Sequence, residues 1–396
     1  MSPTLPDDSL EFFRIPIADG AVGAVDEAIS IHMERFDAAS GTGVEFDLRP
    51  CRYLEVEAAL CVSATLFWCR AKKVAVRLRL PESKATRDFL RQWSVPLAFE
   101  ESTKMRFWDL VHPTDRTYFG ENPELSDQKY SGRVVLYEGR QHSIPENYFP
   151  IHTYRPSGEH FSHTLATDEA IRWRPEFLTS ILARHLRGPQ NYLSSRIVWE
   201  ALMNAIRHPR ASLIQTGSRF YHSSHGLSHL TLACWDNGLD IVSTLRNGIA
   251  AGSIVPESSQ TYPEVTYTLN VDGSVSTVTS RAVPGLESPD HFVLLASTFP
   301  GTTSNPAAAT SRPPVLGDSP RFAGPGMGLY LLLNAAVTVF GGAVSVRSSR
   351  FFMNIKGPRA SSSGANYSAK IVTRTARYCF PGNLLVIRLP LRRRKP

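Results

Sequence analysis

The chain has 396 residues, of which 42% are hydrophobic and 20% charged, and its 43 Lys and Arg against 36 Asp and Glu give a formal net charge of +7. This composition excludes a disordered chain and predicts two or three folded domains, each with a substantial core. The basic excess is small, so it permits contact with nucleic acid without requiring it.

Targeting signals and cysteines indicate the compartment. No segment approaches the ~20 apolar residues of a membrane-spanning helix, and residues 1–20 lack the pattern of a signal peptide. Five irregularly spaced cysteines in apolar segments predict reduced, buried thiols; they are Cys51, Cys61, Cys69, Cys234 and Cys379. We therefore expect a cytoplasmic protein without membrane contact.

The first 110 residues alternate between strand and helix patterns. Alternating or helical spacing of apolar residues predicts strands at 12–17, 44–48 and 73–80, and helices at 21–36, 55–72 and 83–93. Ser83 stands where the last helix needs an N-cap. This order is typical of an α/β domain.

Residues 111–166 form a connecting region rich in proline and tyrosine. Aromatic residues at this density indicate packed rather than disordered chain, and a short strand is predicted at 133–137. An amphipathic helix is predicted at 167–186.

The next helical pattern carries Glu200 and Asn204, four residues apart and therefore side by side on one face. An amide oxygen is a hard ligand that suits Mg²⁺, and a neighbouring carboxylate can orient a water molecule or a hydroxyl group. The same spacing is also common on solvent-facing helices, so the pair alone does not define a site.

Strand patterns at 212–221 and 228–235 follow, and the second ends in Asp236-Asn237-Gly238. A strand that ends in this way can deliver the Asp236 carboxylate into a site, while Gly238 allows a ligand close to the backbone. An ordinary turn is the alternative.

A glycine-rich segment precedes the last predicted helix, at 330–340. Gly324, Gly326 and Gly328 lead into this helix, which ends at Gly341-Gly342. Backbone N–H groups at a helix start, together with the helix dipole, favour phosphate binding. A flexible loop would show the same glycine spacing.

Taken in order, these segments resemble the GHKL ATPase superfamily, the Bergerat-fold group of gyrase, heat-shock chaperones, mismatch-repair ATPases and histidine kinases. The resemblance covers about 168–391. The amino-acid sequence around Glu200 is most similar to that of the superfamily's serine kinases and anti-sigma factors, and to that of stand-alone bacterial ATP-binding proteins. It implies an α+β fold: a two-layer α/β sandwich with helices on one face of a mixed sheet, and two closing strands after the last helix.

The resemblance also implies a role for each matching residue. Asn204 would hold Mg²⁺, Asp236 beside Gly238 would accept the adenine amino group, and Glu200 would be the base that activates water or a hydroxyl. The glycine segment would surround the phosphates of ATP through Gly324, Gly326 and Gly328.

Three positions depart from the family pattern. Asp240 replaces the second glycine of the family's D-x-G-x-G turn, and Pro325 removes one backbone donor from the glycine segment. Asn383 follows Gly382 where the family has a threonine hydroxyl that supports the adenine-binding aspartate, so an amide would have to support Asp236 instead.

Residues 1–110 resemble, more distantly, the STAS domain of anti-sigma antagonists. The place of that family's phospho-accepting serine is occupied by Glu55-Val56-Glu57, which has no hydroxyl. Glu55 or Glu57 could hold a permanent negative charge there, but acids in a first helical turn, which the helix dipole favours, are the preferred interpretation.

The predicted organisation is a STAS-like domain at 1–110, a connecting region at 111–166 and a GHKL domain at 167–396 with a lid insertion at 243–323. A hairpin is predicted inside the insertion at 265–278. The expected function is Mg²⁺-dependent ATP binding with slow hydrolysis, in which an ordered lid controls a protein partner. An anti-sigma-like serine/threonine kinase is the alternative, and a non-catalytic nucleotide module the third hypothesis. Because many relatives dimerise, a homodimer stays open.

Overall fold

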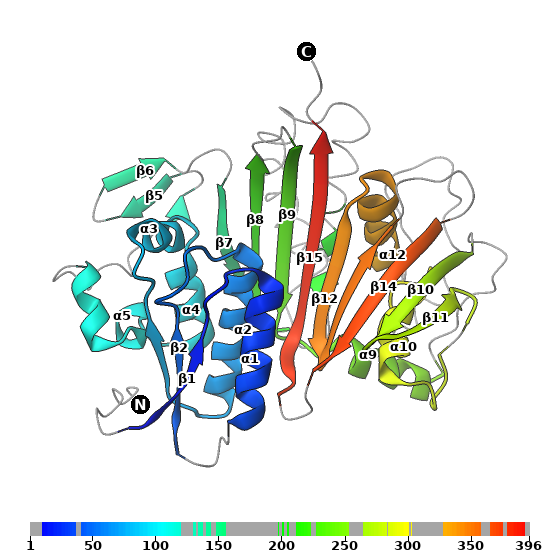
Figure 1. The fold of residues 1–396 in the computed structure, drawn as a ribbon, viewed down its shortest axis with the longest axis horizontal. Helices are drawn as coiled ribbons and strands as arrows, with labels where there is room; N and C mark the ends of the chain where they lie inside the picture. The colour runs from blue at the N-terminus through cyan, green and yellow to red at the C-terminus, as the bar shows by residue number, and fades with distance from the viewer. Residues whose placement is uncertain are drawn as a thin grey trace. The chain divides into compact units, whose positions relative to one another are not determined.

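The structure is a computed structural model. It describes residues 10–36, 41–119, 130–131, 134–137, 140–143, 148–155, 197, 200–201, 204–205, 211–222, 227–252, 264–282, 284–300, 302, 328–357, 365–374 and 378–392. The fold is mixed α+β and divides into two compact units (Figure 1). The first comprises Met1–Arg155, Gln215–Arg219 and Thr375–Pro381, and the second Pro156–Ile214, Phe220–Arg374 and Gly382–Pro396.

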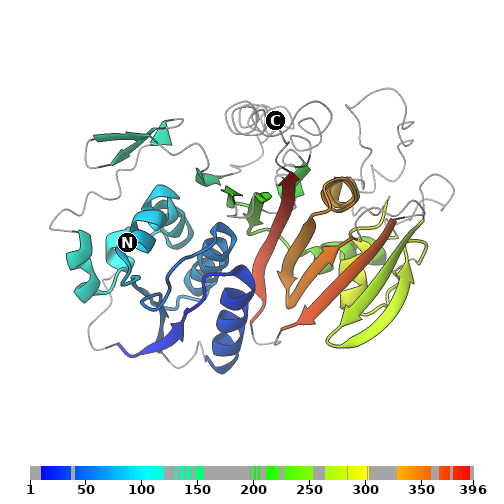
Figure 2. The same ribbon diagram turned by 45° about the horizontal axis from the view of Figure 1, so that its top comes forward.

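The first unit is built on a parallel sheet in the order β1-β2-β3. The elements alternate as predicted, with β1 (Phe12–Pro16), α1 (Val22–Arg35), β2 (Gly43–Asp47), α2 (Val56–Ala71) and β3 (Val76–Arg79). Since both crossovers run in the same direction, the right-handed crossover rule places α1 and α2 on the same face of the sheet. The two helices lie side by side in Figures 1 and 2. Ile15, Val44, Phe46 and Leu78 of this sheet are fully buried, and the charged Glu45 and Asp47 of β2 are buried as well.

Shorter elements complete this unit: α3 (Lys84–Gln92), α4 (Val95–Thr103), α5 (Phe107–Leu110) and the 3-10 helix η2 (Pro113–Phe119). Ser83 caps α3 as predicted, because its side chain accepts the N–H of Thr86. A small antiparallel sheet contains β4 (Tyr130–Ser131), β5 (Val134–Tyr137) and β6 (Arg140–Ser143), so the strand predicted at 133–137 is confirmed. β7 spans Tyr148–Tyr154.

Two later segments of the chain are part of the first unit. Gln215, at the start of β8 (Ile214–His222), accepts the Ser63 hydroxyl at 2.7 Å and donates to the Ala98 carbonyl at 2.8 Å. Tyr378 shares a hydrogen bond of 2.8 Å with Thr65 of α2. These side chains are almost completely buried, so the first unit is not one continuous stretch of sequence.

The second unit contains a mixed sheet with the described strands in the order β11-β10-β14-β13-β12-β15-β9. Their bounds are β9 Leu227–Asp236, β10 Val265–Val271, β11 Ser274–Thr279, β12 Ala343–Ser349, β13 Phe351–Lys356, β14 Ala365–Thr373 and β15 Phe380–Arg392. β10 and β14 are parallel, whereas β10 with β11, β12 with β13, β13 with β14 and β9 with β15 are antiparallel.

Helices cover one face of this sheet at β10 and β14. Tyr267 and Tyr367 are paired across the two strands and buried, while Thr268, Ser368 and Lys370 on the opposite face are exposed. The buried face contacts the helical segment that begins with α12 (Gly328–Leu333), because the Tyr367 hydroxyl bonds Thr338 at 2.9 Å. Alternation of this kind is the pattern of a two-layer arrangement.

Part of the range predicted as a lid insertion, 243–323, belongs to this sheet and the helices packed on it. It contains most of α9 (Ile241–Ala250), the β10–β11 hairpin and α10 (Asp290–Ala296), whose Val293 and Leu294 are fully buried. The hairpin was predicted, but the pairing of β10 with β14 was not.

The helix predicted at 330–340 is confirmed: α12 continues as the π-helix η5 (Asn334–Val339), and Gly341 ends it with a positive φ. Four described strands follow it, β12 to β15, whereas the resemblance implied two.

Candidate functional site

Asp236, the residue predicted to recognise adenine, is the last residue of β9 and is buried, with 5% of its surface exposed. Its Oδ1 accepts the backbone N–H of Gly238 at 2.9 Å, which closes a tight turn directly after the strand. The local sequence favours this geometry, because aspartate often accepts the N–H two residues further on. The turn predicted after this strand is therefore confirmed.

Asn383 supports Asp236 from the neighbouring strand. The two residues are direct partners in the β9–β15 register, and Asn383 Nδ2 lies 3.3 Å from Asp236 Oδ1. The same Nδ2 donates to the Leu239 carbonyl at 3.0 Å, and the Asn383 Oδ1 accepts the Ile241 N–H at 2.9 Å. Each polar atom of this amide is therefore engaged, which fixes its orientation beside the carboxylate.

Ser348 completes this arrangement and was not singled out from the sequence. Its hydroxyl donates to Asn383 Oδ1 at 2.7 Å and also accepts the N–H of Ile241 at 2.9 Å. Ser348 is fully buried and is the next-to-last residue of β12. Because its role depends on sheet neighbours that are distant in sequence, no local pattern could have indicated it.

Gly382 allows the close approach of β15 to Asp236. Its φ is +75°, and a Cβ at this position would lie 1.7 Å from the Asp236 carbonyl oxygen. A positive φ and a backbone contact this short both require glycine.

Asp240, which replaces the second glycine of the family turn, is the N-cap of α9. Its carboxylate accepts the N–H of Ser243 at 2.9 Å and the Ser243 hydroxyl at 2.6 Å. The backbone of Asp240 is extended, with φ −64°, so glycine is not required there. Asp240 therefore caps α9, and the turn at Gly238 remains intact.

Glu200 and Asn204 lie on a helix, as expected. Ile197, Ala201 and Ala205 form its buried line, and Glu200 is itself buried, with 3% of its surface exposed, whereas Asn204 is partly exposed. Glu200 is thus not on a solvent-facing surface. The alternative interpretation, that the pair lies on an exposed helix face, therefore does not hold for Glu200.

The glycine segment is described only from Gly328, the first residue of α12. The predictions for Gly324 and Gly326 lie outside the described residues. Gly328 does open a helix, as predicted.

Two hydroxyl groups within the range predicted as a lid insertion form hydrogen bonds inside their own unit. The Thr298 hydroxyl bonds the Leu295 carbonyl at 2.7 Å and the Tyr267 hydroxyl at 3.1 Å, inside the core. The Ser297 hydroxyl donates to the Leu294 carbonyl at 2.6 Å.

The cysteines are all free thiols, as predicted, and four of the five are buried. Burial raises the pKa of the Cys51 thiol to about 11, and also raises the pKa of Cys234 beside Asp236. Cys379 is exposed, which corrects the prediction that every thiol is buried. Its neighbours Tyr378 and Phe380 take the buried positions, since side chains alternate along extended chain.

The acids at the start of α2 follow the preferred interpretation. Glu55 is the N-cap residue of α2, and its carboxylate accepts the N–H of Val22 at 3.0 Å in the first turn of α1. Glu57 lies in the first turn of α2 and is buried. Both acids therefore stand at helix starts.

Among the described residues no cluster of three or more His, Cys, Asp or Glu could hold a metal ion, and none of the described helices could span a bilayer. No family model, curated protein or solved structure matches the chain.

Proposed function

We propose that the chain is a Mg²⁺-dependent ATP-binding protein of the GHKL type, which hydrolyses ATP slowly and whose nucleotide state controls a protein partner. The observation that carries this proposal is the pairing of Asp236 with Asn383. The family places a supporting hydroxyl on the last strand, opposite the adenine-binding aspartate, and this chain has an amide at that position, aligned with the carboxylate.

The residues fit an adenine at this position. A carboxylate at a strand end, held by Gly238 N–H and the Asn383 amide, has a fixed orientation and can accept an exocyclic amino group. The hydrogen bonds of Asp236 to its protein partners offset the free energy of desolvating its carboxylate when the chain folds. Ligand binding therefore does not have to offset it.

The remaining roles follow the resemblance. Asn204 would contribute an amide oxygen to Mg²⁺, which keeps most of its ligands as phosphate oxygens and water. Glu200 would orient the attacking water or hydroxyl, and Gly328, with Gly324 and Gly326, would lie against the phosphates. Mg·ATP would supply the transferable phosphoryl group.

Incubation with γ-labelled ATP and Mg²⁺ tests the proposal and separates it from the kinase alternative. Release of labelled inorganic phosphate supports slow hydrolysis, whereas label on a partner protein supports phosphoryl transfer. We expect Asn204→Ala to lose Mg·ATP binding and Glu200→Ala to keep binding but lose turnover. Unchanged turnover in the Glu200 variant would contradict its role as the base.

A further inference from the structure

A row of charged side chains crosses the three-stranded sheet of the first unit. Arg14 on β1, Glu45 on β2 and Arg77 on β3 are direct register partners, so they stand side by side on one face. Their neighbours in sequence, among them Val44 and Phe46, point to the opposite, apolar face. The charged row therefore lies on the face opposite to the one that α1 and α2 cover.

Glu45 is held between the two arginines. Its Oε1 accepts Arg14 Nε at 3.1 Å and its Oε2 accepts Arg77 Nε at 2.9 Å. Only 3% of the Glu45 side chain is exposed, against 55% for Arg14 and 19% for Arg77. The carboxylate is thus covered, whereas Arg14 is largely exposed and Arg77 partly exposed.

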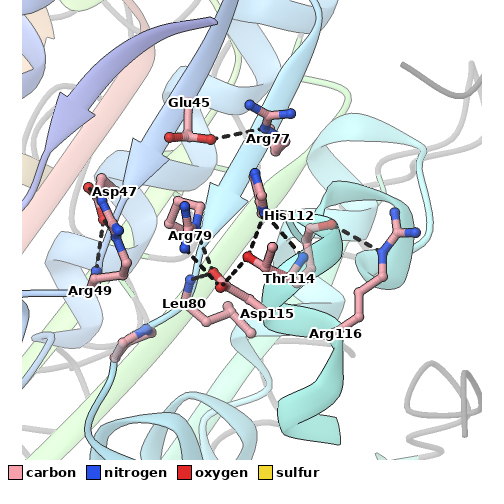
Figure 3. Close-up of polar contacts among 12 residues, drawn as sticks. Glu45, Asp47, Arg49, Arg77, Arg79, Leu80, His112, Thr114, Asp115 and Arg116 are labelled. Atoms are coloured by element: carbon pink, nitrogen blue, oxygen red, sulfur yellow. Dashed lines mark hydrogen bonds and ion pairs between the residues drawn. The ribbon is translucent and has the colours of Figure 1, made fainter. Parts of the chain in front are cut away.

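A second group of charges adjoins this row (Figure 3). Arg79 contacts Asp115 through Nε at 2.9 Å and Nη2 at 3.1 Å, and Arg49 contacts Asp47 in the same two-point manner. Both carboxylates are buried, and hydrogen bonding to Arg49 holds the pKa of Asp47 below its usual range. In both pairs the arginine side chain is more exposed than its carboxylate, at 16% for Arg79 and 31% for Arg49.

The Arg14 and Arg77 guanidinium groups bond Glu45 through Nε alone. Within the described part of the chain, their terminal nitrogens donate to no other residue. Arg77 is also stacked over the Phe12 ring, with 3.8 Å between its Cζ and the ring centroid. Both donor ends are therefore positioned in advance, which lowers the entropy cost of binding a carboxylate in two-point fashion.

We propose that this arginine face, defined by Arg14, Arg49, Arg77 and Arg79, binds an acidic segment of a protein partner through carboxylate side chains. The charge balance favours this occupant over nucleic acid. Four arginines over three buried carboxylates leave only one net positive charge. Nucleic-acid affinity depends on neutralising many phosphates, whereas discrete guanidinium ends suit discrete carboxylates. The inference does not depend on ATP binding by the second unit.

The test uses the full chain and a synthetic oligoglutamate peptide, with a serine-for-glutamate peptide of equal length as the ligand control. Calorimetric or fluorescence titration should show binding of the oligoglutamate peptide only. Arg14→Gln and Arg77→Gln should each weaken it about tenfold, the usual loss for one charge-assisted pair. Arg70→Gln is the matched control, because it removes the same charge from an exposed position on α2 and should leave affinity unchanged.

Arg77→Gln could destabilise the fold, because it leaves Glu45 with a single arginine. The double variant Glu45→Gln with Arg77→Gln removes the pair together, and it should fold and bind weakly. Three results would overturn the proposal: no binding of oligoglutamate at millimolar concentration, equal weakening by Arg70→Gln, or tighter binding of inorganic phosphate or a single-stranded RNA than of the peptide.

Discussion

Replacing Gly382 with alanine should disrupt the junction between β15 and β9. The added Cβ would meet the Asp236 carbonyl oxygen at 1.7 Å and the Asn237 Cα at 2.7 Å, whereas real Cβ contacts essentially never fall below 3.0 Å. The start of β15 must therefore move by about 1.3 Å, the difference between 1.7 and 3.0 Å. A shift of that size breaks the 3.3 Å contact between Asn383 and Asp236.

The expected cost combines two terms. A left-handed conformation for alanine costs about 1–2 kcal/mol, and loss of two or three hydrogen bonds of Asn383 adds about 2–3 kcal/mol. The free energy of unfolding should thus fall by about 3–5 kcal/mol. Gly341→Ala provides the control, because Gly341 has a similar φ of +66° but no atom within 4 Å of the added Cβ.

Urea unfolding of the two variants measures the difference. Gly341→Ala should lose only the conformational term, and Gly382→Ala should lose about 2–3 kcal/mol more. Equal stability of the two variants would show that the β15–β9 junction adapts freely, and would refute the argument that this junction fixes Asp236.

The thiols and the first unit can be tested separately from the nucleotide site. In the folded protein, iodoacetamide should label Cys379 and leave the four buried cysteines unmodified until urea is added; rapid labelling of Cys234 would contradict its burial. Although burial alone would raise it, hydrogen bonds from Arg79 and the Leu80 N–H hold the pKa of Asp115 below its ordinary value. The stability that this carboxylate contributes is therefore present above about pH 4 and lost as the pH falls through the lowered pKa, so urea unfolding of Asp115→Asn and wild type should converge in acid. Finally, a fragment of residues 1–155 should be much less stable than this unit in the full chain, because it lacks the segments that supply Gln215 and Tyr378; thermal unfolding at the full-chain temperature would contradict this.

Local patterns predicted most of the elements of the first unit. The strands and helices between residues 12 and 93 could be predicted because apolar residues repeat there with a period of two or near four. The N-cap predicted at Ser83 is also confirmed. The participation of Gln215 and Tyr378 in the same core could not be predicted, since their contacts depend on tertiary packing over more than 100 residues.

The same limit applies to the candidate site. Asp236 and Gly238 could be paired from a short motif, and Asn383 from its place in the family pattern. Ser348 and the parallel pairing of β10 with β14 depend on sheet order, which single-sequence periodicity does not encode. Asp240 was noted as a departure, yet its capping role becomes evident only where α9 begins.

Calorimetric titration with ATP, with and without Mg²⁺, decides whether Asp236 lies in a nucleotide site. We expect Mg²⁺-dependent binding by the wild type and by Asp240→Ala, which removes only the cap of α9, and no binding by Asp236→Ala. Absence of ATP binding in the wild type, or undiminished binding by Asp236→Ala, would contradict this expectation.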